Sequence, residues 1–354
     1  MAKLGDLKLA MGTSIFIASF IFGLFLFGMI FIAQYYFEFS LTWTLIAAVG
    51  GTALFVLFEY AIGPAIVSAT THLKYLKPGE NPWLENTVRE LADKSGLPMP
   101  RVATVPNPTP NAFTFGRTSK SATLAVHDGL LRNLNKDEVR GVIAHELGHI
   151  RHKDYIVMTA LAALPMLAYI VAQVAFRAGL FSSASSRRGK NEGNAGAALL
   201  AIGAASFVVY IVSFLAVMRL SRLREHYADS YSAYLTGNPR GLESALTKIT
   251  YGLSIAPKAT AEARSFYIED PAMAKQEIQT IMENKEEYDL DHDGVLDEHE
   301  LEHAMEQEAK STWVQLNSAF ATHPPTFKRI LLLREIEQEM DTGKYTADRI
   351  YVHI

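Results

Sequence analysis

The sequence is organised around Ala144-His-Glu-Leu-Gly-His-Ile150, a His-Glu-x-x-His motif flanked by apolar residues. Residues four apart share one face of an α-helix, so His145 and His149 can hold a single zinc ion through their imidazole nitrogens. Glu146 projects beside that face, where its carboxylate can take a proton from a metal-bound water molecule. The motif therefore predicts a helix that carries a hydrolytic zinc site.

The chain carries a second copy of the same pattern, His299-Glu-Leu-Glu-His303. This copy lies in a strongly acidic segment, and a further glutamate, Glu302, stands between its two histidines. A zinc site needs shielded ligands that are held by hydrogen bonds from their neighbours. The apolar surroundings of the first copy therefore favour it as the metal site, and the second copy is interpreted as a coincidence.

A catalytic zinc ion takes three protein ligands and leaves one position open for water. The second polar block of the chain opens with a predicted helix in which Glu225 and Asp229 share a face. Glu225 can complete a His2Glu ligand set, and Asp229 can accept a hydrogen bond from a ligating imidazole. The alternative is an interfacial helix whose arginine and glutamate side chains pair with one another, but the first motif favours metal binding.

The composition excludes a fully soluble protein, because 49% of the 354 residues are hydrophobic and only 20% are charged. Four apolar stretches reach the roughly 20 residues that a helix needs to cross a bilayer. They are Met11–Phe37, Thr42–Val67, Ile156–Phe176 and Ala195–Met218. The chain contains no cysteine, so a bound metal must use histidine, aspartate or glutamate. A net charge of −4 argues against a nucleic-acid partner.

The four spans divide the chain into regions: two transmembrane helices in 1–71, a first polar block in 72–154, a transmembrane hairpin in 155–218 and a second polar block in 219–354. An even number of spans separates the polar blocks, so both lie on one side of the membrane and can build one site together. Lysine and arginine gather next to the spans on that side, although Arg187 and Arg188 lie in the opposite loop. This charge pattern predicts a cell-membrane protein with a cytoplasmic site and cytoplasmic termini.

The polar blocks mix helices with strands. Three segments have the pattern of short strands: Arg101–Val105, Asn111–Gly116 and Ser121–His127. Glu85–Leu97 has helical spacing, and the motif helix is expected to start at Asn135, because Asn135 and Glu138 have the spacing of a capping box. The predicted fold class is an α-helical membrane protein with four transmembrane helices and an α+β peptidase domain.

Several motifs occur in the order seen in the HtpX membrane metalloproteases, and the chain resembles that family over most of its length. These motifs are Asn111-Ala-Phe, Gly129-Leu-Leu, Ala144-His-Glu-Leu-Gly-His, Ser221-Arg…Glu225…Ala228-Asp229 and Thr322-His-Pro-Pro…Arg329. More distantly, the chain is similar to the CAAX prenyl proteases and the mitochondrial Oma-type proteases. The resemblance implies a gluzincin-like peptidase on a bundle of membrane helices, with zinc at His145, His149 and Glu225 and with Glu146 as the base.

The resemblance also implies roles for residues that spacing alone does not single out. It assigns substrate binding to the start of an edge strand, at Asn111, Ala112 and Phe113. Such a strand can pair with an extended peptide by strand addition. His323 can donate a hydrogen bond to the oxyanion of the tetrahedral intermediate, and Arg329 can pair with Asp229. Without the resemblance, the alternative interpretations are an ordinary strand at Asn111–Phe113, a turn histidine at His323 and a surface arginine at Arg329.

A segment at about 274–310 departs from the family pattern. It contains Asp289-Leu-Asp-His-Asp-Gly-Val-Leu-Asp-Glu-His-Glu300, which fits the calcium-binding loop of an EF-hand. The expected calcium ligands are Asp289, Asp291, Asp293, the carbonyl of Val295, Asp297 and Glu300. The alternative is a solvated acidic connector. Because bound calcium can order the nearby segment that delivers His323, the activity is expected to be calcium-modulated.

The predicted function is the hydrolysis of peptide bonds in misfolded or damaged membrane proteins, as a part of protein quality control. The expected partners are polypeptide substrates and the lipid bilayer. Two alternatives stay open: a calcium-responsive membrane adaptor with a non-catalytic metal site, and a prenyl-protein protease of the CAAX type. An intramembrane protease is disfavoured, because charged residues such as Asp137 and Lys153 flank the motif.

Overall fold

The structure of the protein, a computed structural model, describes residues 5, 7–9, 11–14, 16–17, 41–185, 192–255, 268, 271–293, 296–308 and 321–354. The chain divides into two compact units. One unit comprises residues 1–8, 63–156 and 218–354, and therefore includes most of both polar blocks. The other unit comprises residues 9–62 and 157–217, which hold most of the apolar stretches.

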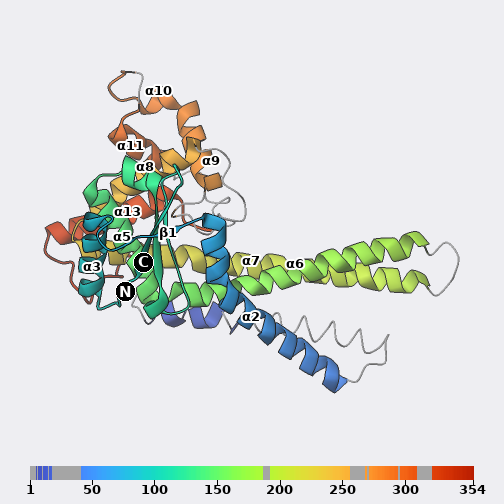
Figure 1. Cartoon of the computed structure of the whole chain (residues 1–354). Coiled ribbons are helices and arrows are strands. Elements are labelled where there is room, and N and C mark those ends of the chain that lie inside the picture. Colours follow the sequence, from blue (N-terminus) through green and yellow to red (C-terminus); the bar gives the residue numbers. More distant parts are fainter. Residues whose placement is uncertain are drawn as a thin grey trace. The chain divides into compact units, whose positions relative to one another are not determined.

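The apolar unit contains the long parts of three helices: α2 (Leu41–Thr71), α6 (Asp154–Ser185) and α7 (Glu192–Thr236). Within this unit α6 and α7 lie side by side (Figure 1), and the rings of Tyr169 and Tyr210 stand 5.4 Å apart between them. Among the described residues, one helix is long and apolar enough to cross a membrane, Gly196–Thr236. Four spans therefore remain a prediction, and most of the first lies outside the described residues.

The other unit contains a four-stranded sheet in the order β1-β2-β4-β3. Its strands are β1 (Lys74–Tyr75), β2 (Arg101–Val105), β3 (Ala112–Phe115) and β4 (Thr123–His127). β2 and β4 run parallel, and the other two pairs are antiparallel. The three predicted strands are confirmed, β2 with its predicted bounds and β3 and β4 slightly shorter than predicted, whereas β1 was not expected. β3 lies at the end of the described sheet, so one of its sides is an edge.

Three helices accompany the sheet in sequence: α3 (Pro82–Ser95), α4 (Asp128–Asn133) and α5 (Lys136–His152), together with the short 3-10 turn η1 (Ser119–Ser121). The predicted capping box of α5 is confirmed. Asn135 Oδ1 accepts hydrogen bonds from the Asp137 and Glu138 amides, and Glu138 Oε2 accepts one from the Asn135 amide. α5 ends at Lys153, whose left-handed φ of 61° breaks the helix just before α6.

Small residues let α5 approach two other helices closely. A Cβ atom on Gly148 would lie 3.1 Å from Ala228 Cα in α7, which is a tight contact. A Cβ atom on Gly141 would lie 2.8 Å from the backbone nitrogen of Leu242 in α8 (Pro239–Ile255), where nothing larger than glycine fits. These close approaches set the face of α5 that bears the motif against α7.

The C-terminal helices are α9 (Pro271–Glu283), α10 (Lys285–Tyr288), α11 (Glu298–Glu308) and α13 (Thr326–Asp341). The segment before the acidic loop forms two helices, α9 and α10, which are separated at Asn284. A buried apolar cluster joins all four: Ile278, Ile281, Tyr288, Leu301, Ala304, Met305, Phe327 and Ile330. Figure 1 shows α9, α10 and α11 gathered together in orange. The helices that flank the acidic loop thus share one core with α13.

Candidate metal centre and active site

The imidazoles of His145 and His149 meet at one point beside α5. Their Nε2 atoms lie 3.1 Å apart, and the Glu225 carboxylate of α7 lies 3.4 Å from the first and 3.6 Å from the second. Glu225 Oε2 is buried and makes no hydrogen bond of good geometry within the described residues. Two imidazole nitrogens and one carboxylate are the donor set of a His2Glu zinc site, and an unpartnered buried oxygen suits a cation. The three residues therefore fit a zinc ion.

Nearby carboxylates favour positive charge at both imidazoles. Burial alone would lower the pKa of His149, but the charge of Glu225 and a hydrogen bond with Asp154 outweigh it and raise this pKa to about 10. Burial likewise opposes protonation of His145, yet its contacts with Asp229 and Glu225 raise the pKa of that ring. A proton and a metal ion compete for such nitrogens, so the same negative field supports a divalent cation.

A carboxylate holds the second ring nitrogen of His145. Asp229 Oδ1 lies 2.9 Å from His145 Nδ1. Arg329 of α13 donates from Nε and Nη2 to the two oxygens of Asp229, at 2.8 and 2.7 Å, and from Nη1 to the Ile268 carbonyl. Arg329 and Asp229 are both 0% exposed. The structure brings these two side chains together and so connects α13 to the helix of the motif.

His149 has a carboxylate of its own, which the sequence analysis did not single out. Asp154 Oδ2 lies 2.7 Å from His149 Nδ1, and Arg224 Nε lies 3.1 Å from the same oxygen. This contact could not be predicted from residue spacing, because residues five apart do not share a face of a continuous helix. The helix break at Lys153 brings Asp154 back toward His149.

The two predicted catalytic residues lie close to this cluster. Glu146 is 3% exposed and follows His145 on α5. His323 lies in the segment just before α13, with Nε2 3.7 Å from Glu225 Oε1 and Nδ1 2.9 Å from the Thr322 hydroxyl oxygen. The structure therefore brings His323 beside the third candidate ligand, although it is about 180 residues from the motif in sequence.

The residues expected to bind substrate lie at the start of the edge strand. Asn111 directly precedes β3, and its side-chain oxygen accepts a hydrogen bond from the Ile268 amide at 2.9 Å. The Asn111 carbonyl accepts another from the His127 amide at 2.9 Å. Ala112 and Phe113 are buried, and the Phe113 ring belongs to the core of the sheet. It is therefore the main chain of this strand, and not the Phe113 ring, that can meet a peptide.

The predicted calcium loop lies between α10 and α11. Three of its carboxylates lie close enough together to share a cation: Asp289, Asp291 and Asp293. Glu300 Oε1 accepts a hydrogen bond from the Leu290 amide at 2.7 Å, and Oε2 accepts one from the Asp297 amide at 3.0 Å. Val295 lies outside the described residues. The loop is thus compact around Glu300, and calcium binding stays a prediction.

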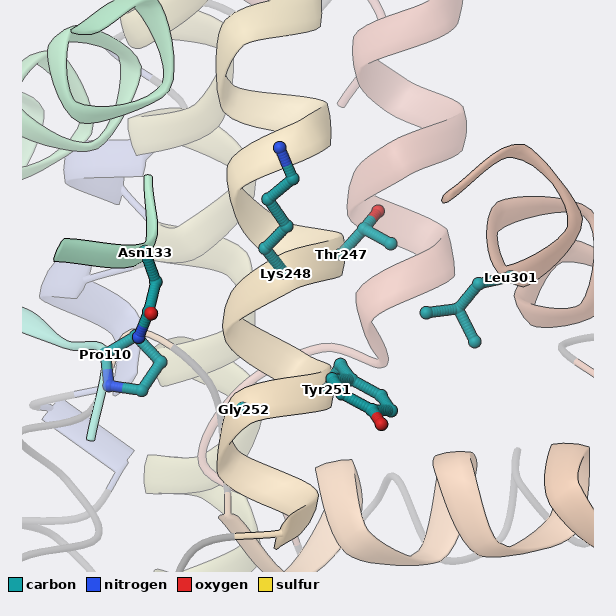
Figure 2. A pocket seen from close by; sticks show the side chains of 7 residues that line it. All are labelled: Pro110, Asn133, Thr247, Lys248, Tyr251, Gly252 and Leu301. Atoms are coloured by element: carbon teal, nitrogen blue, oxygen red, sulfur yellow. The ribbon is translucent and has the colours of Figure 1, made fainter. Parts of the chain in front are cut away.

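A separate cavity of about 320 Å³ lies along α8 (Figure 2). Its walls are Pro110, Asn133, Thr247, Lys248, Tyr251, Gly252 and Leu301. Gly252 allows this arrangement, because a Cβ atom there would lie 2.7 Å from the Pro110 ring. No residue of the His-His-Glu cluster is among the described residues that line the cavity. It is therefore distinct from the candidate active site.

Comparison with known proteins identifies the family. Residues 78–337, which include all three candidate ligands, match Peptidase family M48. The chain belongs to this peptidase family. A protein named Protease HtpX homolog from Aeropyrum pernix is 34% identical over 278 residues, which are 78% of this chain and 82% of that protein. A protein of the same name from Moorella thermoacetica is 31% identical over 317 residues, 87% of this chain and 91% of that protein.

A solved structure is also similar. The crystal structure of S. mikatae Ste24p matches with a TM-score of 0.46 and 17% sequence identity, and the match covers 94% of this chain and 66% of that one. Membership of family M48 and the likeness to HtpX proteases confirm that the chain is a membrane metalloprotease, a hydrolase that acts on peptide bonds. A non-catalytic adaptor is thereby disfavoured. Among the described residues, His145, His149 and Glu225 form one group that could hold a metal ion, and Asp289, Asp291 and Asp293 form another. The first group has the His2Glu donors of a zinc site.

Proposed function

We propose that this M48 peptidase is a membrane-bound zinc endopeptidase whose zinc ion is held by His145, His149 and Glu225. One observation carries the proposal: the donor atoms of these three side chains all lie within 4.8 Å of one another. They come from two helices, α5 and α7. Both ring-supporting carboxylates are buried, as a shielded zinc site requires.

Each residue around the proposed zinc site has a separate role in the reaction. Bound here, zinc would polarise the scissile carbonyl and would lower the pKa of a water molecule, so that the water loses a proton more easily and becomes a better nucleophile. Glu146 takes the proton of the attacking water and passes it to the leaving amine. Asp229, held by Arg329, accepts a hydrogen bond from His145 Nδ1 and so keeps Nε2 of that ring free to bind metal. His323 donates a hydrogen bond to the developing oxyanion.

The substrate is expected to add to the sheet as an extended strand along the side of β3 that does not face β4, beginning at Asn111, Ala112 and Phe113. Strand addition uses main-chain hydrogen bonds, so it selects an extended, unfolded segment rather than a particular side chain. A locally unfolded segment is available in misfolded or damaged proteins. Damaged membrane proteins are therefore the substrate class that fits a peptidase attached to a membrane.

Four membrane spans carry the peptidase, with its site and both termini in the cytoplasm. The support is the length of the apolar stretches and the lysine and arginine residues next to them. Because the chain contains no cysteine, single cysteines can be added in each loop and labelled with a membrane-impermeant thiol reagent. Labelling from outside the cell of a cysteine next to α5 would contradict this orientation.

The acidic loop binds calcium and modulates this activity. Its expected ligands are Asp289, Asp291, Asp293, Val295, Asp297 and Glu300. The buried cluster shared by α9, α11 and α13 offers a physical connection, since α13 begins three residues after His323. A change in the loop can reach His323 through that core. Full activity after removal of calcium by a selective chelator would count against this modulation.

The test of the proposal compares wild type with Glu146→Gln in detergent, after zinc loading. Cleavage of an unfolded protein and self-cleavage are followed together with bound zinc. We expect the variant to keep its zinc and to lose about 10²- to 10⁴-fold in rate, which is what a general base contributes. Equal cleavage by both proteins would point to a contaminating protease. A zinc-bound wild type that cleaves nothing would favour a peptidase of narrow specificity, such as the prenyl-protein type.

A further inference from the structure

Asp154 is the first residue of α6, yet it belongs structurally to the metal centre. It is 1% exposed, and its Oδ2 lies 2.7 Å from His149 Nδ1. The same oxygen lies 3.1 Å from Nε of Arg224, which directly precedes Glu225 on α7. Asp154 Oδ2 therefore contacts the ring of His149, which is one candidate ligand. It also contacts the guanidinium of Arg224, which is the neighbour in sequence of another candidate ligand.

The contact geometry favours the imidazole over the ion pair. An arginine and an aspartate that serve only to bind each other prefer a bidentate arrangement with two parallel hydrogen bonds. Here Asp154 Oδ1 and both Nε and Nη1 of Arg224 are buried and make no hydrogen bond of good geometry within the described residues, so Arg224 contacts Asp154 through its charge alone. The oxygen that approaches Arg224 is the one turned to His149, at the shorter of the two distances. The carboxylate is thus oriented for the ring.

We infer that Asp154 and Arg224 are a positioning pair for His149, in which Asp154 fixes the ring and Arg224 fixes Asp154. The inference rests on the proposed zinc site. An imidazole that donates its Nδ1 proton to a carboxylate keeps the Nε2 lone pair for metal and cannot rotate freely. The positive charge of Arg224 compensates the negative charge of the Asp154 carboxylate, which is buried away from solvent.

His145 and His149 are then supported in the same way, each by a carboxylate that contacts an arginine. His145 has Asp229 backed by Arg329, and His149 has Asp154 backed by Arg224. The second pair differs in where it comes from. Asp154 and Arg224 stand on α6 and α7, the two helices that enter the predicted membrane hairpin. A shift of either helix end would therefore change the orientation of His149.

The test measures zinc affinity of the full chain in detergent by competition with a chromophoric chelator. Asp154→Asn keeps the shape of the side chain and removes its charge, and we expect a loss of about 10- to 100-fold in affinity. Asp93→Asn, at an exposed position of α3, is the matched control and should bind zinc like wild type. The visible absorption bands of the Co²⁺-loaded proteins report ligand geometry, and we expect them to shift only in the Asp154 variant.

A purely structural role of Asp154 would leave the affinity of the folded variant and its Co²⁺ bands unchanged, and that result overturns the inference. Should Asp154→Asn not fold, Asp154→Glu replaces it. This variant keeps the charge that Arg224 needs and displaces it by one methylene, and the same loss in affinity and shift of the bands are expected. Absence of zinc binding by the wild-type protein would instead overturn the proposed function itself.

Discussion

Two segments of this chain carry the same five-residue pattern, yet their surroundings differ. Both lie on α-helices, residues 145–149 on α5 and residues 299–303 on α11, so the paired histidines share a face in each. In the first copy, His145 and Glu146 are buried. In the second copy, His299 is exposed and His303 is only partly buried.

The difference arises from what other helices bring. α7 brings Glu225, the proposed third ligand, and Asp229, the proposed ring support, to the first copy. In the part of the chain that the structure describes, His299 and His303 join no group of three possible metal ligands. Glu300 uses both oxygens on amides of the acidic loop. A helix can align two imidazoles by itself, whereas a metal centre also needs tertiary packing.

The largest expected difference between the two copies appears when the second histidine of each is replaced by alanine. His149→Ala is expected to lower peptide cleavage by at least about 10³-fold, because several kcal/mol of transition-state stabilisation depend on the metal. His303→Ala is expected to stay within about twofold of wild type, as an ordinary surface substitution does. Cleavage rates and bound zinc after dialysis measure both. Similar losses in the two variants would contradict the assignment of the metal site.

The second copy is expected to contribute to calcium binding, because it contains Glu300. Glu300→Gln removes the charge of a proposed calcium ligand, and we expect calcium affinity to fall about 10- to 100-fold, with bound zinc unchanged. Glu302→Gln lies in the same acidic segment at a position outside the loop pattern and serves as the control. Terbium luminescence or calorimetry measures the affinity. Equal calcium affinity in wild type and Glu300→Gln would exclude an EF-hand.

The helix of the first copy is also anchored more firmly than an isolated helix. Glu138 Oε1 accepts hydrogen bonds from the Ser244 hydroxyl at 2.7 Å and from Lys248 Nζ at 2.5 Å, both in α8, while Oε2 caps α5. Burial raises the pKa of Glu138, but these hydrogen bonds and the Lys248 charge outweigh it and leave the pKa below its ordinary value. Ionised Glu138 therefore stabilises the fold.

Glu138→Gln is expected to lower the free energy of unfolding by about 1–2 kcal/mol at neutral pH. Because the folded pKa is depressed, this stabilisation is present above the unfolded value of about 4.3 and is lost as the pH falls through the lower folded value. Glu90→Gln, which breaks an exposed ion pair with Arg140, should cost less than about 1 kcal/mol. Thermal unfolding in detergent at several pH values measures both. A larger loss for Glu90→Gln would contradict this ranking.

The sequence was sufficient for the parts of the site that depend on local spacing. The helical period places His145, Glu146 and His149 on one turn of α5, and the same period pairs Glu225 with Asp229. The cap at the start of α5 could be predicted as well, because it uses side chains only three residues apart. These features require no knowledge of how distant segments pack.

Other parts of the site depend on backbone detail and long-range packing. Asp154 reaches His149 because Lys153 adopts a positive φ. No local residue pattern predicts this backbone angle, since a positive φ is uncommon for residues other than glycine. Ile268 receives a hydrogen bond from Arg329 and donates one to Asn111, a link between segments about 60 and 160 residues apart. β1 has two residues, too few for an alternating pattern. The role of His323 came from family resemblance and not from spacing.

The central claim is that a zinc ion binds at the first copy of the motif, and anomalous X-ray scattering tests it most directly. Crystals of the zinc-loaded full-length protein, measured on either side of the zinc absorption edge, locate the ion without reference to activity. We predict one peak about 2.0–2.2 Å from His145 Nε2, His149 Nε2 and a carboxylate oxygen of Glu225. A zinc peak between His299 and His303, with none at the first copy, would contradict the claim.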